Sequence, residues 1–494
     1  MPHEHVYIHQ ALIDYMNHRL YRVPSSGICL GIASMGIQAL LLDDDELQKF
    51  CERLNSIIIQ LPTHKSDDLS FIIFNLDQQK DIDIFFEGVL LYQMAYKYKK
   101  LLTENQTVNL TINDYRSLVF KLIKPEKLDN RNMYTLLTIL GCYTYSEIEK
   151  FLNILKTTII KILSKNPVGL MLYIHNHIVA LGYNCASNTW TVIDANMLYI
   201  LDQTYSCHDT AKLLIQAFTM LKATIEEEIK IVFSTELIIT MDSRCLDNVK
   251  LSAAMRDKFI LELSVHDEWK QIHKITKDKL GKTHDGSSWL FMAAKDGKLE
   301  IVNQLIEAKV DVNLRKDNNG TTPLWVAIQG NHLDVVVALL DAGAKVDIAN
   351  DLTGTTPLII AAQNNYITIL DCLLEADAYV NHKNHKGITA LLVAIQNNHL
   401  QSTKSLIKAE ADVNLTADNN ITPLRMAIEN KSYPIVEVLM HANAKLDNRV
   451  REDTDLMCFS KEENIGKNFF PMYDARDLEG FCDNNKLEVK LHLC

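Results

Sequence analysis

The chain has 494 residues, more than one hydrophobic core usually holds, so two or three domains are expected. Hydrophobic residues make up 47% and charged residues 23%, which is typical of a soluble globular protein. The formal net charge of −12 argues against nucleic acid or an anionic membrane as the main partner.

Two parts of the N-terminal 42 residues bear on whether the chain has a targeting or membrane segment. Residues 1–7 lack the basic and apolar regions of a signal peptide, so none is expected. Residues 23–42 are uncharged, but they are rich in glycine and serine and contain Pro24. We therefore predict a buried helix over 26–42 in preference to a membrane span.

The ten cysteines are scattered along the chain without a C-x-x-C pair. This pattern indicates a reducing compartment and favours neither a disulfide framework nor a zinc site. We expect no metal and no cofactor. Nine of the cysteines are interpreted as structural.

The remaining cysteine, Cys29, lies in SSGICLGIASMGIQALL, with glycine two residues before and two residues after it. The apolar run that follows predicts a helix beginning near Cys29, whose dipole favours a thiolate. The alternative is a buried apolar cysteine. Acidic residues 43–46 are predicted to open the next helix, and residues 65–165 are predicted to be mostly helical.

Two β-rich segments, VGLMLYIHNHIVALGY and NTWTVIDANMLYI, flank the polar turn NCASN and predict a hairpin. If the turn centres between Cys185 and Ala186, His177 faces Asp194 with Cβ atoms about 5 Å apart. A carboxylate at that separation can orient an imidazole. His175 competes with His177 for this role, and Asp194 could instead be only a turn residue.

Three short strings resemble a known family of enzymes: GICLG, HIVAL and DAN are similar to the cysteine, histidine and aspartate motifs of the YopT-like branch of papain-fold cysteine proteases. The resemblance implies an α+β papain-like domain in which Cys29 is the nucleophile, His177 the base and Asp194 the group that orients the base. The same triad also serves deamidases and transglutaminases.

One departure from the papain pattern concerns the oxyanion donor. Papain-like enzymes place an amide side chain five or six residues before the nucleophile, where this chain has Val23 and Pro24. The backbone N–H of Cys29 can donate one hydrogen bond to the oxyanion, and a second donor would have to come from Ser25, Ser26 or a distant asparagine or glutamine side chain. The open alternatives are a domain that has lost activity and now only binds, and a scaffold without the papain fold.

The C-terminal half repeats itself. Five strings of the form TTPLWVAIQGNHLDVVVALLDAGAKVD align without gaps, with anchors spaced 34, 34, 33 and 33 residues apart: Ser288, Thr322, Thr356, Thr389 and Thr422. Threonine before proline predicts a helix N-cap, and Gly343 predicts the stop of a second helix. The spacing drops at residues 381–386, where we expect the weakest junction of one continuous stack.

These strings resemble ankyrin repeats, which implies an all-α solenoid whose units stack to bury their faces. The first, fourth and fifth units depart from the pattern, and irregular terminal units are expected in such a stack: Trp289 and Ala390 replace proline, Asn420 replaces the turn glycine, and Pro434 lies in the last second helix. Ankyrin proteins bind partners through turn tips and exposed ends of first helices. Here the resemblance assigns partner binding to Trp325, Gln329, Gln363, Gln396, Arg425 and Glu429, with Lys316 among further tip residues.

The predicted organisation has four parts. A papain-like domain spans 1–245, a helical linker 246–283, five ankyrin repeats 284–448, and a C-terminal cap or tail 449–494. The acidic tail is similar to type IV secretion signals, and the whole resembles ankyrin-repeat effectors of intracellular bacteria such as Legionella. The resemblance implies secretion into a host cell, action in host cytoplasm or nucleus, and a host protein as partner, with no membrane span.

Overall fold

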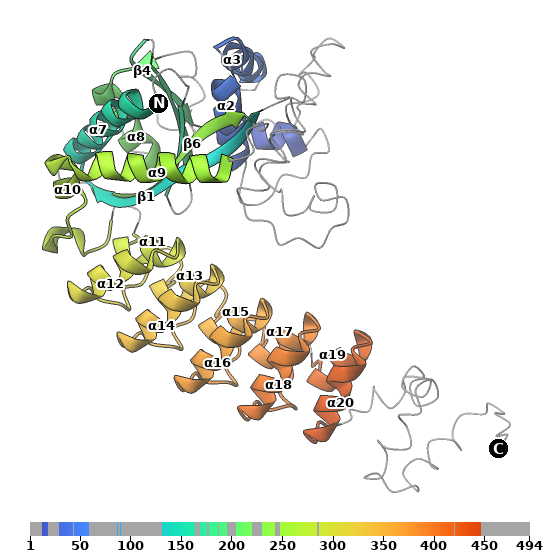
Figure 1. The fold of residues 1–494 in the computed structure, drawn as a ribbon. Helices are drawn as coiled ribbons and strands as arrows, with labels where there is room; N and C mark the ends of the chain where they lie inside the picture. The colour runs from blue at the N-terminus through green and yellow to red at the C-terminus, as the bar shows by residue number, and fades with distance from the viewer. Residues whose placement is uncertain are drawn as a thin grey trace, which may run out of the picture. The chain divides into compact units, whose positions relative to one another are not determined.

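A computed structural model describes these parts of the chain: 12–17, 29–42, 44–58, 86, 89, 131–163, 168–174, 177–185, 187–194, 204–219, 230–242, 248–283, 286–418 and 420–445. The chain divides into two compact units, residues 1–344 and 345–494, and each is described by itself. The first unit holds a sheet with its helices and two helical repeats, and the second holds three further repeats (Figure 1).

The sheet of the first unit has six antiparallel strands in the order β1-β6-β2-β3-β4-β5. Their bounds are β1 Arg131–Tyr143, β2 Val168–Tyr173, β3 Ile178–Asn184, β4 Thr189–Asp194, β5 Thr204–Tyr205 and β6 Ile231–Asp242. The predicted hairpin with the turn NCASN is β3 and β4. The first of its two segments contains a second hairpin, β2 and β3, beyond whose last pair the N–H of Ile174 donates to His177 O at 3.0 Å.

Strand β1 corrects the prediction that residues 65–165 are mostly helical. Its sequence, RNMYTLLTILGCY, contains two threonines and two tyrosines, which favour strands. It does not alternate between polar and apolar residues because residues 139–143 are all buried, on both faces of the strand, and because the ladder with β6 shifts between Thr135 and Leu137. The helical expectation holds for α7, Tyr145–Leu163.

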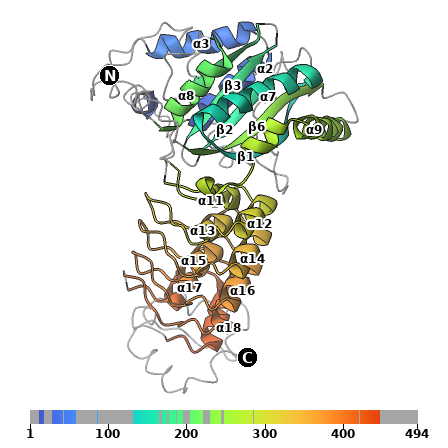
Figure 2. The ribbon, with the colours of Figure 1, turned by 90° about the vertical axis from the view of Figure 1, so that its left-hand side faces the viewer.

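Helices cover the two faces of the sheet (Figure 2). Helix α2, Cys29–Leu42, packs on β2, β3 and β4 and is followed by α3, Asp44–Ile58, as the sequence predicts. The opposite face holds the main apolar core with α7 and α8, Cys207–Thr219. The expected linker contains α9 Asn248–Ser264, α10 Asp267–Ile272 and η3 Lys277–Lys279, and α9 and α10 pack against α7 and β1.

Five helical pairs follow, each with a first helix of seven residues and a second helix of nine. The pairs in the first unit are α11 Trp289–Lys295 with α12 Leu299–Glu307, and α13 Pro323–Gln329 with α14 Leu333–Asp341. The pairs in the second unit are α15 Pro357–Gln363 with α16 Ile367–Glu375, α17 Ala390–Gln396 with α18 Leu400–Lys408, and α19 Pro423–Glu429 with α20 Tyr433–His441.

The predicted N-caps are confirmed in all five repeats. Each anchor hydroxyl accepts a hydrogen bond from the backbone N–H three residues later, as in Ser288 with Phe291 at 3.1 Å and Thr322 with Trp325 at 3.2 Å. Pro434 causes no break because it lies in the first turn of α20, where its missing N–H has no helical partner.

The stack continues across the junction that was expected to be weakest. Helices α15 and α17 pack together on either side of residues 381–386, and the N–H of His385 donates to Thr353 O at 2.9 Å. Within residues 345–445, one contact recurs at three successive junctions of the stack. Side chains of Asp347, Asn381 and Asn414 accept from the backbone N–H of the next repeat at 3.0, 2.8 and 2.7 Å.

Candidate functional site

Helix α2 approaches the sheet closely because both sides of the contact carry small residues. A Cβ atom on Gly36 would lie 2.6 Å from Cδ1 of Ile193 in β4, and one on Gly169 in β2 would lie 2.7 Å from Cδ1 of Ile37. Cys29 is the first residue of α2, as predicted, although its side chain lies outside the described part of the structure.

His177 and Asp194 meet at the end of the β3–β4 hairpin. Nε2 of His177 lies 2.7 Å from Oδ1 of Asp194, and the two residues are 6% and 0% exposed. A carboxylate can only accept, so Nε2 carries the hydrogen and Nδ1 is the basic nitrogen of this tautomer. The arrangement is that of a carboxylate orienting an imidazole, which is the relation the sequence predicts for these two residues.

The predicted register of the hairpin is wrong by two residues. Asp194 is paired with Val179, not with His177. The turn is centred one residue later along the chain than expected, since Asn184 pairs with Thr189. Side chains alternate faces with a period of two, so a shift of two keeps His177 on the face of Asp194 as its diagonal neighbour.

The face on which this pair lies constrains any contact with Cys29. Trp190 and Val192 precede Asp194 on the same face, and both belong to the core under α7 and α8. Helix α2 packs on the opposite face, against Ile193. His177 lies one residue before β3 begins, so a Cys29–His177 contact has to be made past the end of the strand.

Several members of the predicted centre fall outside the described residues. These are His175, the alternative base, and the four positions considered for the oxyanion donor: Val23, Pro24, Ser25 and Ser26. The roles of Cys29, His177 and Asp194 in catalysis therefore stay a prediction, while the contact between the last two is a feature of the structure.

The predicted partner-binding residues divide into two groups. Gln329, Gln363, Gln396 and Glu429 end successive first helices and are exposed. Trp325 and Arg425 are half-buried, and Nε of Arg425 donates to Oε1 of Glu429 at 2.7 Å. Lys316 was expected at a solvated tip, but it is 2% exposed with its Nζ 5.6 Å from the ring centroid of Phe291. A cation–π contact on the preceding repeat is therefore its observed role.

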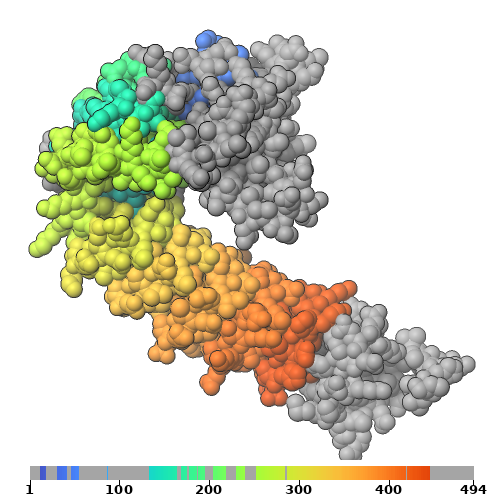
Figure 3. Space-filling model, in the orientation of Figure 1, coloured from blue at the N-terminus to red at the C-terminus, as the bar shows by residue number. Residues whose placement is uncertain are grey.

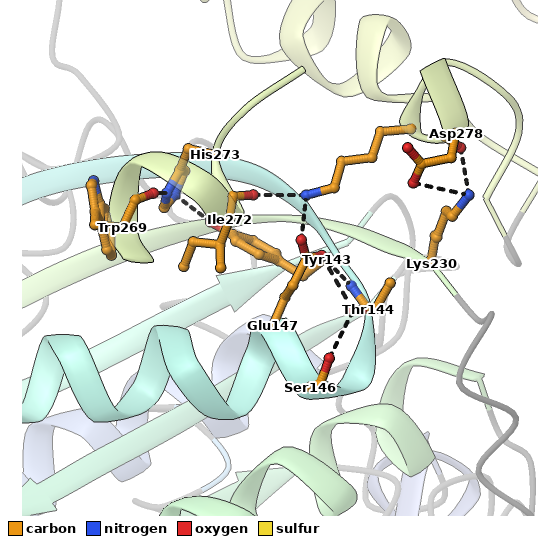
Figure 4. Close-up of polar contacts among 10 residues, drawn as sticks. Tyr143, Thr144, Ser146, Glu147, Lys230, Trp269, Ile272, His273 and Asp278 are labelled. Carbon is orange, nitrogen blue, oxygen red and sulfur yellow. Dashed lines mark hydrogen bonds and ion pairs between the residues drawn. The ribbon is translucent and has the colours of Figure 1, made fainter. Parts of the chain in front are cut away.

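One buried polar cluster was not predicted (Figure 4). Nζ of Lys279 donates at 2.8 Å to both Oε1 of Glu147 and the carbonyl of Ile272. Tyr143 Oη lies 2.7 Å from Nε2 of His273, whose Nδ1 donates to Trp269 O at 2.9 Å. Burial is the main reason that the pKa of His273 is lowered to about 4. No motif marks this cluster, because its partners are about 130 residues apart in sequence.

A family model for ankyrin repeats matches the chain in three overlapping stretches, 253–350, 290–384 and 358–450. The C-terminal region contains ankyrin repeats. Ankyrin repeats mediate binding to protein partners, so protein binding is the kind of function that this region indicates. A search of curated proteins finds no significant match to the chain.

Two further features of the described residues bear on partners. None of the helices in the described ranges combines the length and the apolar character that a bilayer-spanning segment needs. Across the same ranges, His, Cys, Asp and Glu side chains do not gather into groups of three that could hold a metal ion.

Proposed function

We propose that the ankyrin repeats bind a protein and present it to a thiol acyl-transfer centre in the sheet domain. The observation that carries this proposal is the buried His177–Asp194 contact on the sheet against which the helix beginning at Cys29 packs. Gly36 touches Ile193, the neighbour of Asp194. Cys29 is seven residues earlier, about 10 Å along the helix. Because α2 and the pair lie on opposite faces of the sheet, the proposal requires the Cys29 side chain to reach His177 around the end of β3.

The residues then have distinct chemical roles. Nδ1 of His177 takes the proton of the Cys29 thiol, and the thiolate attacks an amide carbonyl of the bound protein. The tetrahedral oxyanion collapses to a thioester while the imidazolium gives its proton to the leaving amine. Water hydrolyses the thioester in a protease or a deamidase, and an amine takes its place in a transglutaminase. Asp194 holds the imidazole in the required tautomer.

The competing function is an interaction protein whose sheet domain no longer catalyses. The observation that favours it is the sequence Val23-Pro24, which puts no amide side chain where papain-like enzymes carry their oxyanion donor. Under this alternative the His177–Asp194 pair only stabilises the hairpin. Secretion into a host cell, with a host protein as the partner, is proposed on the resemblance to bacterial ankyrin effectors alone.

The two functions differ in the reactivity of Cys29, which alkylation with iodoacetamide measures. A thiolate paired with His177 alkylates rapidly at about pH 6, whereas an ordinary cysteine has a pKa of about 8.5. We expect His177→Gln to remove the rapid alkylation at low pH and Asp194→Asn to reduce it. Cys185, in the turn between β3 and β4, is the control, because burial raises its pKa and neither variant should change its alkylation rate.

An alkylation profile of Cys29 that is ordinary and unaffected by His177→Gln would contradict the acyl-transfer proposal. A rapid profile without turnover of any amide substrate would favour the binding function. Secretion is tested separately, by fusing the chain to a reporter enzyme that is active only in host cytosol. Removal of residues 449–494 should then abolish the reporter signal.

A further inference from the structure

The first ankyrin repeat lacks the polar outer face that a terminal repeat needs for solubility. Its first helix, α11, has six consecutive buried residues, 289–294. The last repeat differs, since three residues of its first helix are only half-buried: Arg425, Met426 and Ile428. Helix α11 is therefore buried as deeply as a helix inside the stack.

The surface that covers α11 is the sheet. Helix α11 packs on β1 and β6, the two strands at that edge, and the view in Figure 2 places it directly beside β1. The space-filling view shows the atoms of the first repeat against those of the sheet domain (Figure 3). The first two repeats also belong to the same compact unit as the sheet, residues 1–344.

The segment between the sheet domain and α11 is held at several points. Lys279 is 4% exposed and is bonded to Glu147 at the start of α7. The other oxygen of Glu147 accepts from the N–H of Thr144 at 2.9 Å. Further along, the N–H of Thr283 donates to Ser287 O at 3.0 Å, and Lys282 pairs with Asp317 of the second repeat.

We propose that the sheet domain is the N-terminal cap of the ankyrin stack, and that the Lys279–Glu147 ion pair clasps the two together. The first repeat then unfolds with the sheet and not with the later repeats. A protein bound to the first two repeats stabilises the sheet domain by the same coupling energy with which the sheet favours its binding. The proposal does not rest on any chemistry at Cys29.

Hydrogen exchange of the full-length chain, read by mass spectrometry, tests whether the Lys279–Glu147 ion pair couples the sheet domain to the first repeat. We expect Lys279→Met to raise exchange in α11 and β1 together, by about tenfold or more, because it leaves a carboxylate beside β1 without its cation. Exchange in α17 should not change. Lys161→Met is the matched control, since Lys161 forms an exposed ion pair with Glu262 in the same domain.

The wild-type chain provides a second test if the Lys279→Met variant does not fold. In low denaturant, amides of α11, β1 and β6 should open with one free energy and one denaturant dependence, because they form one cooperative unit. Exchange in which α11 opens with α17 and α19, independently of β1, would overturn the proposal. So would a Lys279→Met chain in which β1 loosens while α11 keeps its protection.

Discussion

Acid should loosen the joint between the sheet domain and the repeats through His273. The pKa of this imidazole is lowered from 6.5 to about 4, first by burial and also by the charge of Lys279. The unfolded segment therefore binds a proton more readily than the folded one. The stabilisation is fully present above the unfolded pKa of 6.5 and is lost progressively as the pH falls toward 4.

The two pKa values fix the size of the effect. Linkage gives a loss of about 2 kcal/mol in the free energy of local opening between about pH 7 and pH 5, approaching about 3 kcal/mol near pH 4. Protonation would also turn Nε2 from the acceptor of the Tyr143 hydroxyl into a donor, which breaks that hydrogen bond in its present sense.

The buried thiol of Cys142, next to Tyr143, reports this opening. Burial raises its pKa to about 12, so it reacts with a pyridyl disulfide only when β1 opens. Labelling rates, corrected with the denatured chain at each pH, give the opening free energy. His273→Gln cannot titrate and should give a nearly flat pH profile, while His208→Gln, at an exposed histidine on α8, should behave as wild type. An equal acid sensitivity in His273→Gln would refute the assignment.

Three other perturbations have defined outcomes. Glu410 adopts a φ of +61°, so Glu410→Gly should stabilise the second unit by up to about 1 kcal/mol in thermal unfolding. Gly343 also has a positive φ, and a Cβ there meets nothing within 4 Å, so Gly343→Ala should destabilise the first unit by about as much through backbone strain alone. Gly36→Ala should lower the free energy of unfolding by about 1–3 kcal/mol, and Ile193→Val, which removes Cδ1, should relieve part of that cost; no relief would mean that the contact with Cδ1 of Ile193 is not the cause. Trp325→Ala should weaken binding to an identified protein partner by about 2 kcal/mol with unchanged circular dichroism, and an unchanged affinity would remove this half-buried residue from the interface.

The repeats could be predicted from sequence because their signals are local. Thr322 caps a helix through a contact within three residues, and a capping threonine or serine recurs five times at a spacing of 33 or 34, three times with proline after it. The same reasoning misplaced Lys316. Its polar character predicts a solvated tip, and only the packing of two repeats reveals that the ammonium group lies over Phe291.

The candidate site was predicted only in part, because its geometry depends on register. The residue types identified His177 and Asp194, and their contact exists despite a two-residue error, since an even shift preserves the face. Strand β1 was missed because its residues do not alternate: residues 139–143 are buried on both faces, and the ladder with β6 shifts between Thr135 and Leu137. The Lys279–Glu147 pair joins residues 132 positions apart, for which a single sequence carries no signal.

Three successive junctions along residues 345–445 share a contact that has an evolutionary consequence. At each one, an aspartate or asparagine accepts from the backbone N–H of the following repeat: Asp347 to 379, Asn381 to 412 and Asn414 to 445. Because the donor is a backbone N–H, the hydrogen bond does not depend on which side chain the donor residue carries, and that residue is Tyr379, Asp412 or Lys445 here. Gene duplication or deletion of one such unit therefore leaves matching junctions on both sides. This end of the chain can lengthen, shorten or change its surface residues while the joints between its units stay the same.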